Sequence, residues 1–180
     1  MTPTRRVIRA KMAEVTRSLP PAHRVLEIGI AGDDPPGANR EFVRLAEGGI
    51  YQTADKDAAL KPDLVLDLTL TWSPVLCVQP FDLVICSQVL EHIWELEAAV
   101  ISLWRLTALG GCCLVDMPFC YPPHGQPGSD PDYWRLTPAG LKRLLHRAGF
   151  GQVEVWVDPA WLAVGAIARK QLTSEEVLSA

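Results

Sequence analysis

The chain has 180 residues, of which 48% are hydrophobic and 21% are charged, and its formal net charge is -4 at pH 7. This length and composition allow one domain with a core of its own, which excludes wholesale disorder. No run of lysine and arginine is long enough to follow a phosphate backbone, and no stretch of about 18 apolar residues occurs, so we expect no nucleic-acid partner and no membrane span.

The N-terminal segment, residues 1–21, is predicted to hold an amphipathic helix over residues 5–19, ended by a pair of prolines. Its charges leave no apolar stretch for a signal peptide, which predicts a cytoplasmic protein. Residues 22–170 are expected to form one domain, and residues 171–180 a short tail.

Strand-like apolar runs alternate with helical patterns along this domain. The runs cover residues 24–30, 50–55, 63–67, 81–87 and 112–118. Helices are predicted over residues 38–49 and 89–111, and the second ends in a glycine pair suited to a C-terminal cap. Such alternation is typical of a Rossmann-like, doubly wound, mostly parallel sheet.

The C-terminal part begins with a long irregular stretch, residues 119–135, rich in proline and glycine. A helix is predicted after it, with Thr137 as N-cap, Pro138 in the first turn and Gly149 just past the end. Two strand-like segments then flank Asp158, which predicts an antiparallel hairpin. The complete prediction is an α/β fold with a seven-stranded sheet.

The five cysteines include no CxxC pair, and we expect free thiols rather than a disulfide or a metal site. No tight cluster of histidine and acidic residues has the spacing of metal ligands, so no metal is predicted.

The first strand is followed by a loop that is unusual for a dinucleotide-binding protein. In the fingerprint GxGxxG, the three glycine positions fall on Gly29, Ala31 and Asp34, so two of the three fail. Asp33 and Asp34 would place negative charge beside a pyrophosphate, which needs backbone amides and a helix N-terminus. A phosphate-containing dinucleotide is therefore disfavoured.

The same loop suits a ligand that carries positive charge and no phosphate. S-adenosylmethionine has an ammonium, a sulfonium and a neutral adenosine. Glu27 at the end of the first strand could face the methionine amine, or could be a buried carboxylate tied to nearby backbone amides. Gly29 and Ala31 would let the backbone approach the ligand closely.

The second strand ends at Asp55, near the spacing at which an acidic residue meets ribose hydroxyls in such folds. We predict that Asp55, with Lys56 beside it, binds the ribose, and Asp57 is the alternative.

Taken in order, these segments resemble the class I S-adenosylmethionine-dependent methyltransferases, particularly their small type 11 group. The resemblance covers residues 22–170 and rests on VLEIGIAG, YQTADKD, PDLVLDLT, FDLVICSQVLEHI, LTALGGCCLVDMPF and DYWRLTPAGLKRLLHRAGF. It departs from the family after Gly29, where a more glycine-rich loop is expected.

The resemblance implies roles for further residues. Asp67 and Leu68 would flank the adenine, and Ser87 and Gln88 would line the methionine portion. His92 would face the acceptor.

Methyl transfer requires mainly that a nucleophile be aligned with the methyl group and that a proton be removed when needed. His92 and His124 are the candidate catalytic bases, although His92 could equally be a packed histidine beside the cofactor. Tyr121, Tyr133 and Arg135 are tentative substrate residues. Arg135 could bind an acidic substrate, but a structural role in the loop is favoured.

The sequence thus predicts a cytoplasmic methyltransferase that acts at oxygen or nitrogen of a small-molecule or carrier-linked acceptor. The acceptor site is either open or completed by a second subunit, as in a homodimer. Two alternatives remain: a non-catalytic methyltransferase-like binding protein whose altered loop has lost the cofactor, and a nicotinamide-dependent oxidoreductase.

Overall fold

The computed structural model describes residues 3–30, 36–70, 79–123 and 131–171. Its strands are β1 (Ala22–Ile28), β2 (Leu45–Asp55), β3 (Leu64–Val65), β4 (Phe81–Ser87), β5 (Thr107–Pro118), β6 (Gln152–Val157) and β7 (Ala163–Arg169). Its α-helices are α1 (Pro3–Arg17), α2 (Leu96–Leu106) and α3 (Pro138–Arg147). Short 3-10 turns are η1 (Arg40–Phe42), η2 (Ala58–Leu60) and η4 (Leu90–His92).

The strands form a seven-stranded sheet in the order β3-β2-β1-β4-β5-β7-β6. Strands β3, β2, β1, β4 and β5 pair in parallel, whereas β7 is antiparallel to both of its neighbours. This confirms the predicted Rossmann-like sheet with an antiparallel C-terminal hairpin. The strand order reverses between β1 and β4, and at such a switch point the carboxyl ends of parallel strands leave a crevice for ligands.

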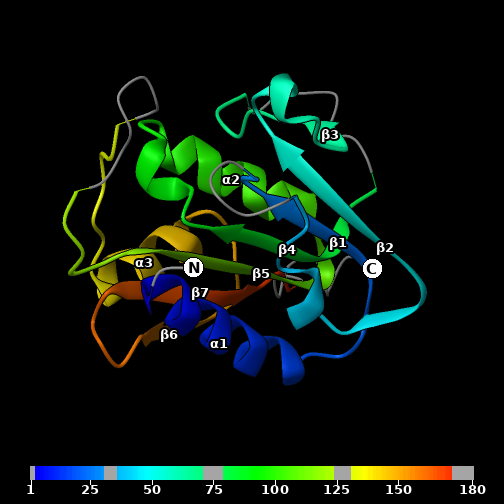
Figure 1. The fold of residues 1–180 in the computed structure, drawn as a ribbon, viewed down its shortest axis with the longest axis horizontal. Coiled ribbons are helices and arrows are strands. Elements are labelled where there is room, and N and C mark those ends of the chain that lie inside the picture. Colours follow the sequence, from blue (N-terminus) through cyan, green and yellow to red (C-terminus); the bar gives the residue numbers. More distant parts are fainter. Residues whose placement is uncertain (1–2, 31–35, 71–78, 124–130, 172–180) are drawn as a thin grey trace, which may run out of the picture.

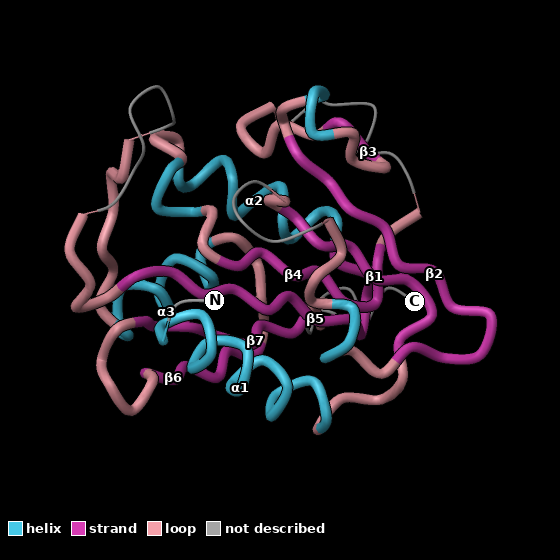
Figure 2. The backbone as a smooth tube through the Cα atoms, in the orientation of Figure 1, coloured by secondary structure: helices cyan, strands magenta, loops and turns pink. Residues whose placement is uncertain are grey.

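Helices cover both faces of the sheet because side chains alternate along each buried strand. Leu26 and Ile28 of β1 point into a core shared with α2 and α3, and Val25 points into a second core shared with α1. Figure 1 shows α2 above the central strands and α1 below them, and Figure 2 shows the same layers as a tube.

Helix α3 forms as its sequence predicts. The Thr137 hydroxyl accepts a hydrogen bond from the Gly140 amide at 3.1 Å, Pro138 occupies the first helical position, and Leu141 and Leu145 are buried. Gly149, just past the end, has φ of +110°. Glycine adopts this positive φ readily, and it leaves room for Trp104, since a Cβ at this position would lie 2.8 Å from Trp104 Nε1.

The prediction of a helix over residues 38–49 was wrong. Only the three-residue turn η1 forms there, and β2 already begins at Leu45. The Thr16 hydroxyl donates to the carbonyl of Phe42, and the Ala22 amide donates to that of Arg44 at 3.0 Å. These tertiary bonds take carbonyls that a helix would have used, so contacts with α1 and β1 override the local pattern.

The glycine pair after α2 does not cap that helix, contrary to the prediction. Helix α2 ends at Leu106, and Thr107 already pairs with Phe81 of β4. Gly110 has φ of +78°, and a Cβ on Gly111 would lie 2.9 Å from the carbonyls of Ala108 and Asp82. The two glycines therefore allow the shift of register with which β5 joins β4.

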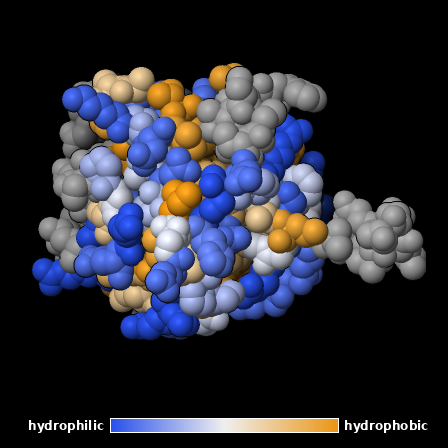
Figure 3. Space-filling model, turned by 90° about the vertical axis from the view of Figure 1, so that its right-hand side faces the viewer, coloured by the Kyte–Doolittle hydropathy of each residue, from blue (hydrophilic) through white to orange (hydrophobic). Residues whose placement is uncertain are grey.

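Hydrophilic residues predominate on the face shown in Figure 3, where hydrophobic ones lie in small separate groups. No helix in the described part of the chain is long and apolar enough to span a membrane. The division into an N-terminal helix, a domain and a tail stays a prediction, and residues 172–180 of that tail lie outside the described ranges.

Candidate active site

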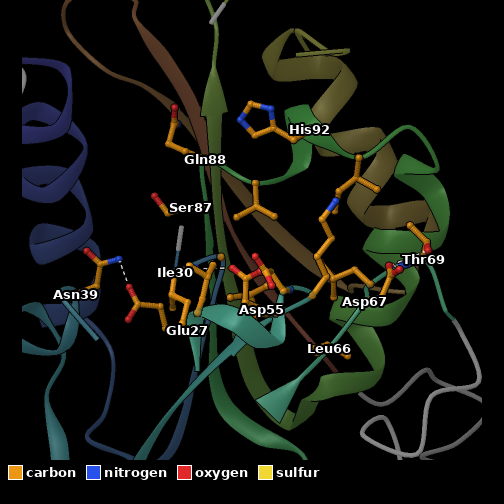
Figure 4. A pocket seen from close by; sticks show the side chains of 18 of the residues that line it. Glu27, Ile30, Asn39, Asp55, Leu66, Asp67, Thr69, Ser87, Gln88 and His92 are labelled. Carbon is orange, nitrogen blue, oxygen red and sulfur yellow. Dashed lines mark hydrogen bonds between the residues drawn. The ribbon is translucent and has the colours of Figure 1, made fainter. Parts of the chain in front are cut away.

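A cavity of about 1330 Å³ opens at the carboxyl ends of β1, β2 and β4. Helix α1 contributes Ile8, Arg9 and Met12 to its wall. Figure 4 shows Glu27 facing Asn39 on one side, Asp67 and Thr69 on the opposite side, and Asp55 between them. Ser87, Gln88 and His92 lie at a further end of the same space.

Glu27 is buried at the end of β1 and has two side-chain hydrogen-bond donors. Asn39 Nδ2 lies 2.6 Å from its Oε1, and the Tyr51 hydroxyl lies 3.0 Å from its Oε2. Burial raises the pKa of Glu27 above its usual range, and the two donors oppose that rise. The carboxylate is therefore held in place, and a cation entering the cavity would stabilise its charged form.

At Gly29 the backbone that follows β1 passes close to the side chain of Val89. Gly29 has φ of +82°, and a Cβ at this position would lie 2.2 Å from Val89 Cγ2. Its amide donates to the Ala54 carbonyl at 2.9 Å. Only glycine fits both the conformation and the space here.

Asp55 is buried at the end of β2, and its carboxylate binds backbone amides in the segment after β1 and in the segment after β2. Its Oδ2 accepts from the Ile30 amide at 3.0 Å and its Oδ1 from the Asp57 amide at 2.9 Å. Each carboxylate oxygen can accept a second bond, so hydroxyl groups of a ligand could still be bound. Lys56 and Asp57 also line the cavity.

Asp67 and Leu68 lie together on the wall opposite Glu27. Asp67 Oδ1 accepts from both the amide and the hydroxyl of Thr69 at 2.8 Å. Leu68 is buried, and its carbonyl accepts from the buried hydroxyl of Ser102 at 2.7 Å. The wall thus combines a fixed carboxylate with an apolar side chain.

Ser87 and Gln88 follow β4 directly and line the cavity. Gln88 has φ of +55°, an uncommon conformation for this residue type that often marks a functional site. Its Nε2 donates to Asp116 Oδ2 at 2.7 Å. Burial raises the pKa of Asp116 to about 6, while its bond to Gln88 opposes the rise.

His92 lines the cavity and its ring is oriented by the segment after β5. Nδ1 lies 3.1 Å from the Pro131 carbonyl, which can only accept, so Nδ1 carries a proton and Nε2 is the basic nitrogen of the neutral ring. Nε2 lies 3.8 Å from Oε1 of Glu91. A proton accepted by Nε2 would therefore be close to a carboxyl group.

Glu91 is fully buried, and neither of its carboxyl oxygens forms a hydrogen bond with the residues that the structure describes. Burial raises its pKa to about 8, with a smaller contribution from the charge of Asp116. Glu91 thus keeps its proton at neutral pH in the absence of a nearby cation.

Of the tentative substrate residues, Tyr133 lines the cavity, whereas Tyr121 and Arg135 do not. Nη1 and Nη2 of Arg135 donate to the carboxylate of Asp132 at 2.5 and 2.6 Å. Nε also donates to the carbonyl of Tyr121, and Nη2 to that of Pro122. All of these contacts lie within the segment between β5 and α3, so they give Arg135 a structural role there.

Two predicted site residues, Ala31 and His124, lie outside the described residues, as do Asp33 and Asp34. Within the described ranges, no group of three or more histidine, cysteine and acidic residues could hold a metal ion. Cys86, Cys112, Cys113 and Cys120 are free thiols.

No protein-family model matches the chain, and no curated protein is similar to it in sequence. Solved structures do match. The CurJ carbon methyltransferase has a TM-score of 0.66 at 18% identity, over 92% of this chain and 54% of that one. The N-methyltransferase NodS from Bradyrhizobium japonicum, in complex with S-adenosyl-L-homocysteine, has a TM-score of 0.63 at 14% identity, over 94% and 88%. Human N-acetylserotonin methyltransferase has a TM-score of 0.64 at 16% identity, over 92% and 52%.

The chain has the class I methyltransferase fold. It spans about half the length of CurJ and of the human enzyme, at 54% and 52%. Within the methyltransferase fold, the described site residues that the sequence predicted gather in one cavity, except Tyr121 and Arg135.

Sequence reasoning missed several residues that line this cavity or contact its lining residues. Asn39 reaches Glu27 from the segment where a helix was predicted, and Tyr51 reaches it from β2. Arg9 comes from α1, far from the strand ends in sequence. Glu91 precedes His92, and a charged residue within an apolar run is a sequence signal that could have indicated it.

Proposed function

We propose that the protein is an S-adenosylmethionine-dependent methyltransferase that acts at oxygen or nitrogen of a small-molecule or carrier-linked acceptor. The observation that supports this best is the placement of Glu27, Asp55 and Asp67 along one cavity. Each carboxylate is fixed by hydrogen bonds and matches one part of the cofactor: the ammonium, the ribose hydroxyls and the adenine amine. The structural neighbours point to the same chemistry.

The residues present fit this cofactor. Glu27 would hold the ammonium, because a buried carboxylate with a raised pKa gains most from an adjacent cation. Asp55 would accept from the ribose hydroxyls, while Gly29 lets the backbone approach the ligand. Asp67 would accept from the adenine amine, with Leu68 against the ring.

The bound cofactor supplies an activated methyl group, so the chain has to orient the acceptor and move a proton. His92 is placed for that proton, because its Nδ1 is bound to Pro131 and its Nε2 remains basic. An oxygen of the protonated Glu91 carboxyl, 3.8 Å from Nε2, would accept a hydrogen bond from the imidazolium once the proton is taken. A general base of this kind contributes roughly 100- to 10,000-fold in rate.

The test is calorimetric titration with S-adenosylhomocysteine and, separately, with NAD. We expect micromolar binding of the first and none of the second. The variant Asp55→Ala should lose binding, and Asp57→Asn serves as its matched control on the neighbouring acid. If Asp57→Asn loses binding instead, the ribose role belongs to Asp57.

A folded protein that binds neither ligand would overturn the proposal and favour the non-catalytic alternative, in which the loop after β1 has lost the cofactor. Binding of NAD alone would favour the oxidoreductase. A cytoplasmic location and assembly as a homodimer stay predictions, which fractionation and sedimentation would test.

A further inference from the structure

A second groove, of about 550 Å³, lies between the start of α2 and α3, beside the main cavity. Trp94 and Glu95 line both spaces. The floor of the groove is apolar and includes Leu96, Leu136 and Leu144. A ligand that passes over Trp94 could therefore occupy the cavity and the groove at once.

The boundary between the two spaces is an aromatic wall, formed by Trp94, Tyr133 and Trp134. Trp94 is stacked on Trp134, with ring centroids 5.2 Å apart, and meets the edge of Tyr133 at 5.4 Å. Even so, 60% of Trp94 and 42% of Tyr133 are exposed. Large aromatic faces left open beside a cavity are suited to stacking with a ring of the ligand.

This wall is held in place by hydrogen bonds within the chain. Trp134 Nε1 donates to the Ile93 carbonyl at 2.9 Å, and the Tyr133 amide donates to the Glu91 carbonyl at 2.7 Å. Both bonds tie the segment before α3 to the segment after β4. The wall is preorganised, so little free energy is lost in ordering its side chains when a ring stacks on it.

Charged residues line both spaces, and those of the groove are two acids, Glu95 and Glu97, and two arginines, Arg143 and Arg147. Acidic side chains gather at the strand ends of the cavity, where Glu27, Asp55 and Asp67 lie. Helix α3 contains Lys142, Arg143 and Arg147 and no acidic residue.

Arg143 and Arg147 line the groove and not the cavity. Arg147 is paired with Glu97 at 3.1 Å. Arg143 is exposed and forms no ion pair or hydrogen bond with the described part of the chain. Its guanidinium is thus available to an anionic group of a ligand in the groove.

We propose that the groove is the second half of the acceptor site, and that the acceptor is an aromatic compound bearing a carboxylate or phosphate group away from its nucleophilic atom. The ring lies against Trp94 and Tyr133, and the anionic group binds Arg143. This inference rests on the proposed function, because it assigns the main cavity to the cofactor and to the reacting end of the acceptor.

The experiment uses three naphthalene probes with the full chain, followed by ligand-observed NMR: 2-naphthoate, 2-naphthyl phosphate and the neutral 2-naphthalenemethanol. Each is titrated with and without S-adenosylhomocysteine. We expect at least one of the two anions to bind about tenfold more tightly than the alcohol. The anion that binds more tightly identifies the acceptor group as carboxylate or phosphate.

Two matched pairs of variants locate the binding. Arg143→Ala should bring the anions to the affinity of the alcohol, whereas Lys142→Ala, which loses the same charge from an exposed neighbour outside the groove, should keep the preference. Trp94→Ala should weaken all three probes about tenfold. Trp161→Ala removes an indole that is also 60% exposed but lines neither space, and should change nothing.

Equal binding of the alcohol and the anions would overturn the inference, as would a preference that survives in Arg143→Ala or disappears equally in Lys142→Ala. An unchanged affinity in Trp94→Ala would do the same. Affinity for S-adenosylhomocysteine is measured in parallel. If the wild type does not bind that ligand, the proposed function fails, while the titrations without it still decide whether the groove binds aromatic anions.

Discussion

The crossover from β1 to β2 and the crossover from β4 to β5 join parallel strands in different ways. In both, the second strand shifts register near its start, at Gly48 and at Gly110, which have φ of +72° and +78°. The crossover to β5 carries the eleven-residue helix α2, which buries one side against the sheet. The described part of the crossover to β2 carries only η1, which buries no residue.

The difference shows that a sheet face can be covered by a helix from elsewhere in the chain. Helix α1 packs on the face of the sheet that a helix between β1 and β2 would otherwise cover. Phe42 and Val43, from the crossover itself, are only partly buried against the same core. The first crossover is thereby left free to place Asn39 beside Glu27.

The two crossovers also differ in the hydrogen bonds made to the buried glutamate that each contains or adjoins. Glu27, at the end of β1, has two side-chain donors. Glu91, which follows β4, has no hydrogen bond to either carboxyl oxygen from the described part of the chain. The donors of Glu27 therefore oppose the effect of burial on its pKa, whereas burial raises the pKa of Glu91 to about 8.

The largest effect is expected where the two crossovers touch, at Gly29 and Val89. Gly29→Ala combines a strained φ with a contact of 2.2 Å to Val89 Cγ2, and we expect it to lower the free energy of unfolding by about 3 kcal/mol. Gly48→Ala is the control for φ alone, because a Cβ there meets nothing within 4 Å, and should cost about 1 kcal/mol. Urea unfolding measures both.

The double variant Gly29→Ala with Val89→Ala separates the two terms. It should recover part of the loss, since Val89 then leaves room, while the φ term remains. If Gly29→Ala and Gly48→Ala are equally destabilising, the crossovers are not in contact at this point.

The next effect compares the apolar anchors of the two crossovers. Leu103→Ala in α2 removes a fully buried side chain and should destabilise the fold by about 3 kcal/mol. Phe42→Ala in η1 removes a partly buried ring and should cost about 1 kcal/mol. Losses of the same size would mean that η1 supports the sheet as strongly as α2 does.

Much of the fold could be predicted from the sequence because buried strands and capped helices carry local signals. The cap at Thr137 and the apolar run of β4 needed no tertiary information. The helix over residues 38–49 was predicted wrongly because Thr16 and Ala22, distant in sequence, bind its carbonyls. The glycine pair after α2 was misread because a cap and a bulge require the same φ.

The candidate site was partly predictable for a similar reason. Side chains at the ends of parallel strands converge by topology, and Glu27, Asp55, Ser87 and Gln88 do line one cavity. The groove depends on α2 and α3 lying side by side, and no spacing in the sequence indicates that arrangement. The same holds for the aromatic wall, whose members come from segments joined by hydrogen bonds at Ile93 and Glu91.

A more gradual effect, smaller at any one pH unit, should appear in the pH dependence of stability, through Glu91. Its pKa in the folded chain is raised by burial to about 8, above the ordinary value of 4.5. Between about pH 5 and 8 the unfolded chain releases a proton that the folded chain keeps, so stability falls as the pH rises, by about 1 kcal/mol per pH unit.

Glu91→Gln should remove this contribution and flatten the profile, as measured by urea unfolding at pH 5, 6, 7 and 8. Glu154→Gln, at an exposed position, is the control and should leave the slope unchanged. A Glu91→Gln profile as steep as that of the wild type would show that Glu91 is charged in the folded state.

The smallest effect concerns the donors of Glu27 and tests whether this acid senses the charge of the ligand. Tyr51→Phe removes the hydroxyl that lies 3.0 Å from Oε2, and since that bond opposes the effect of burial, the pKa of Glu27 rises further. Because a higher pKa disfavours the charged carboxylate, affinity for S-adenosylhomocysteine should then fall by about threefold at pH 6, and the loss should shrink as the pH rises. Asn39→Ala, which removes the donor to Oε1, should act in the same direction. Affinities unaffected by pH in all three proteins would mean that the ammonium lies elsewhere, and that the two donors serve only to satisfy a buried carboxylate.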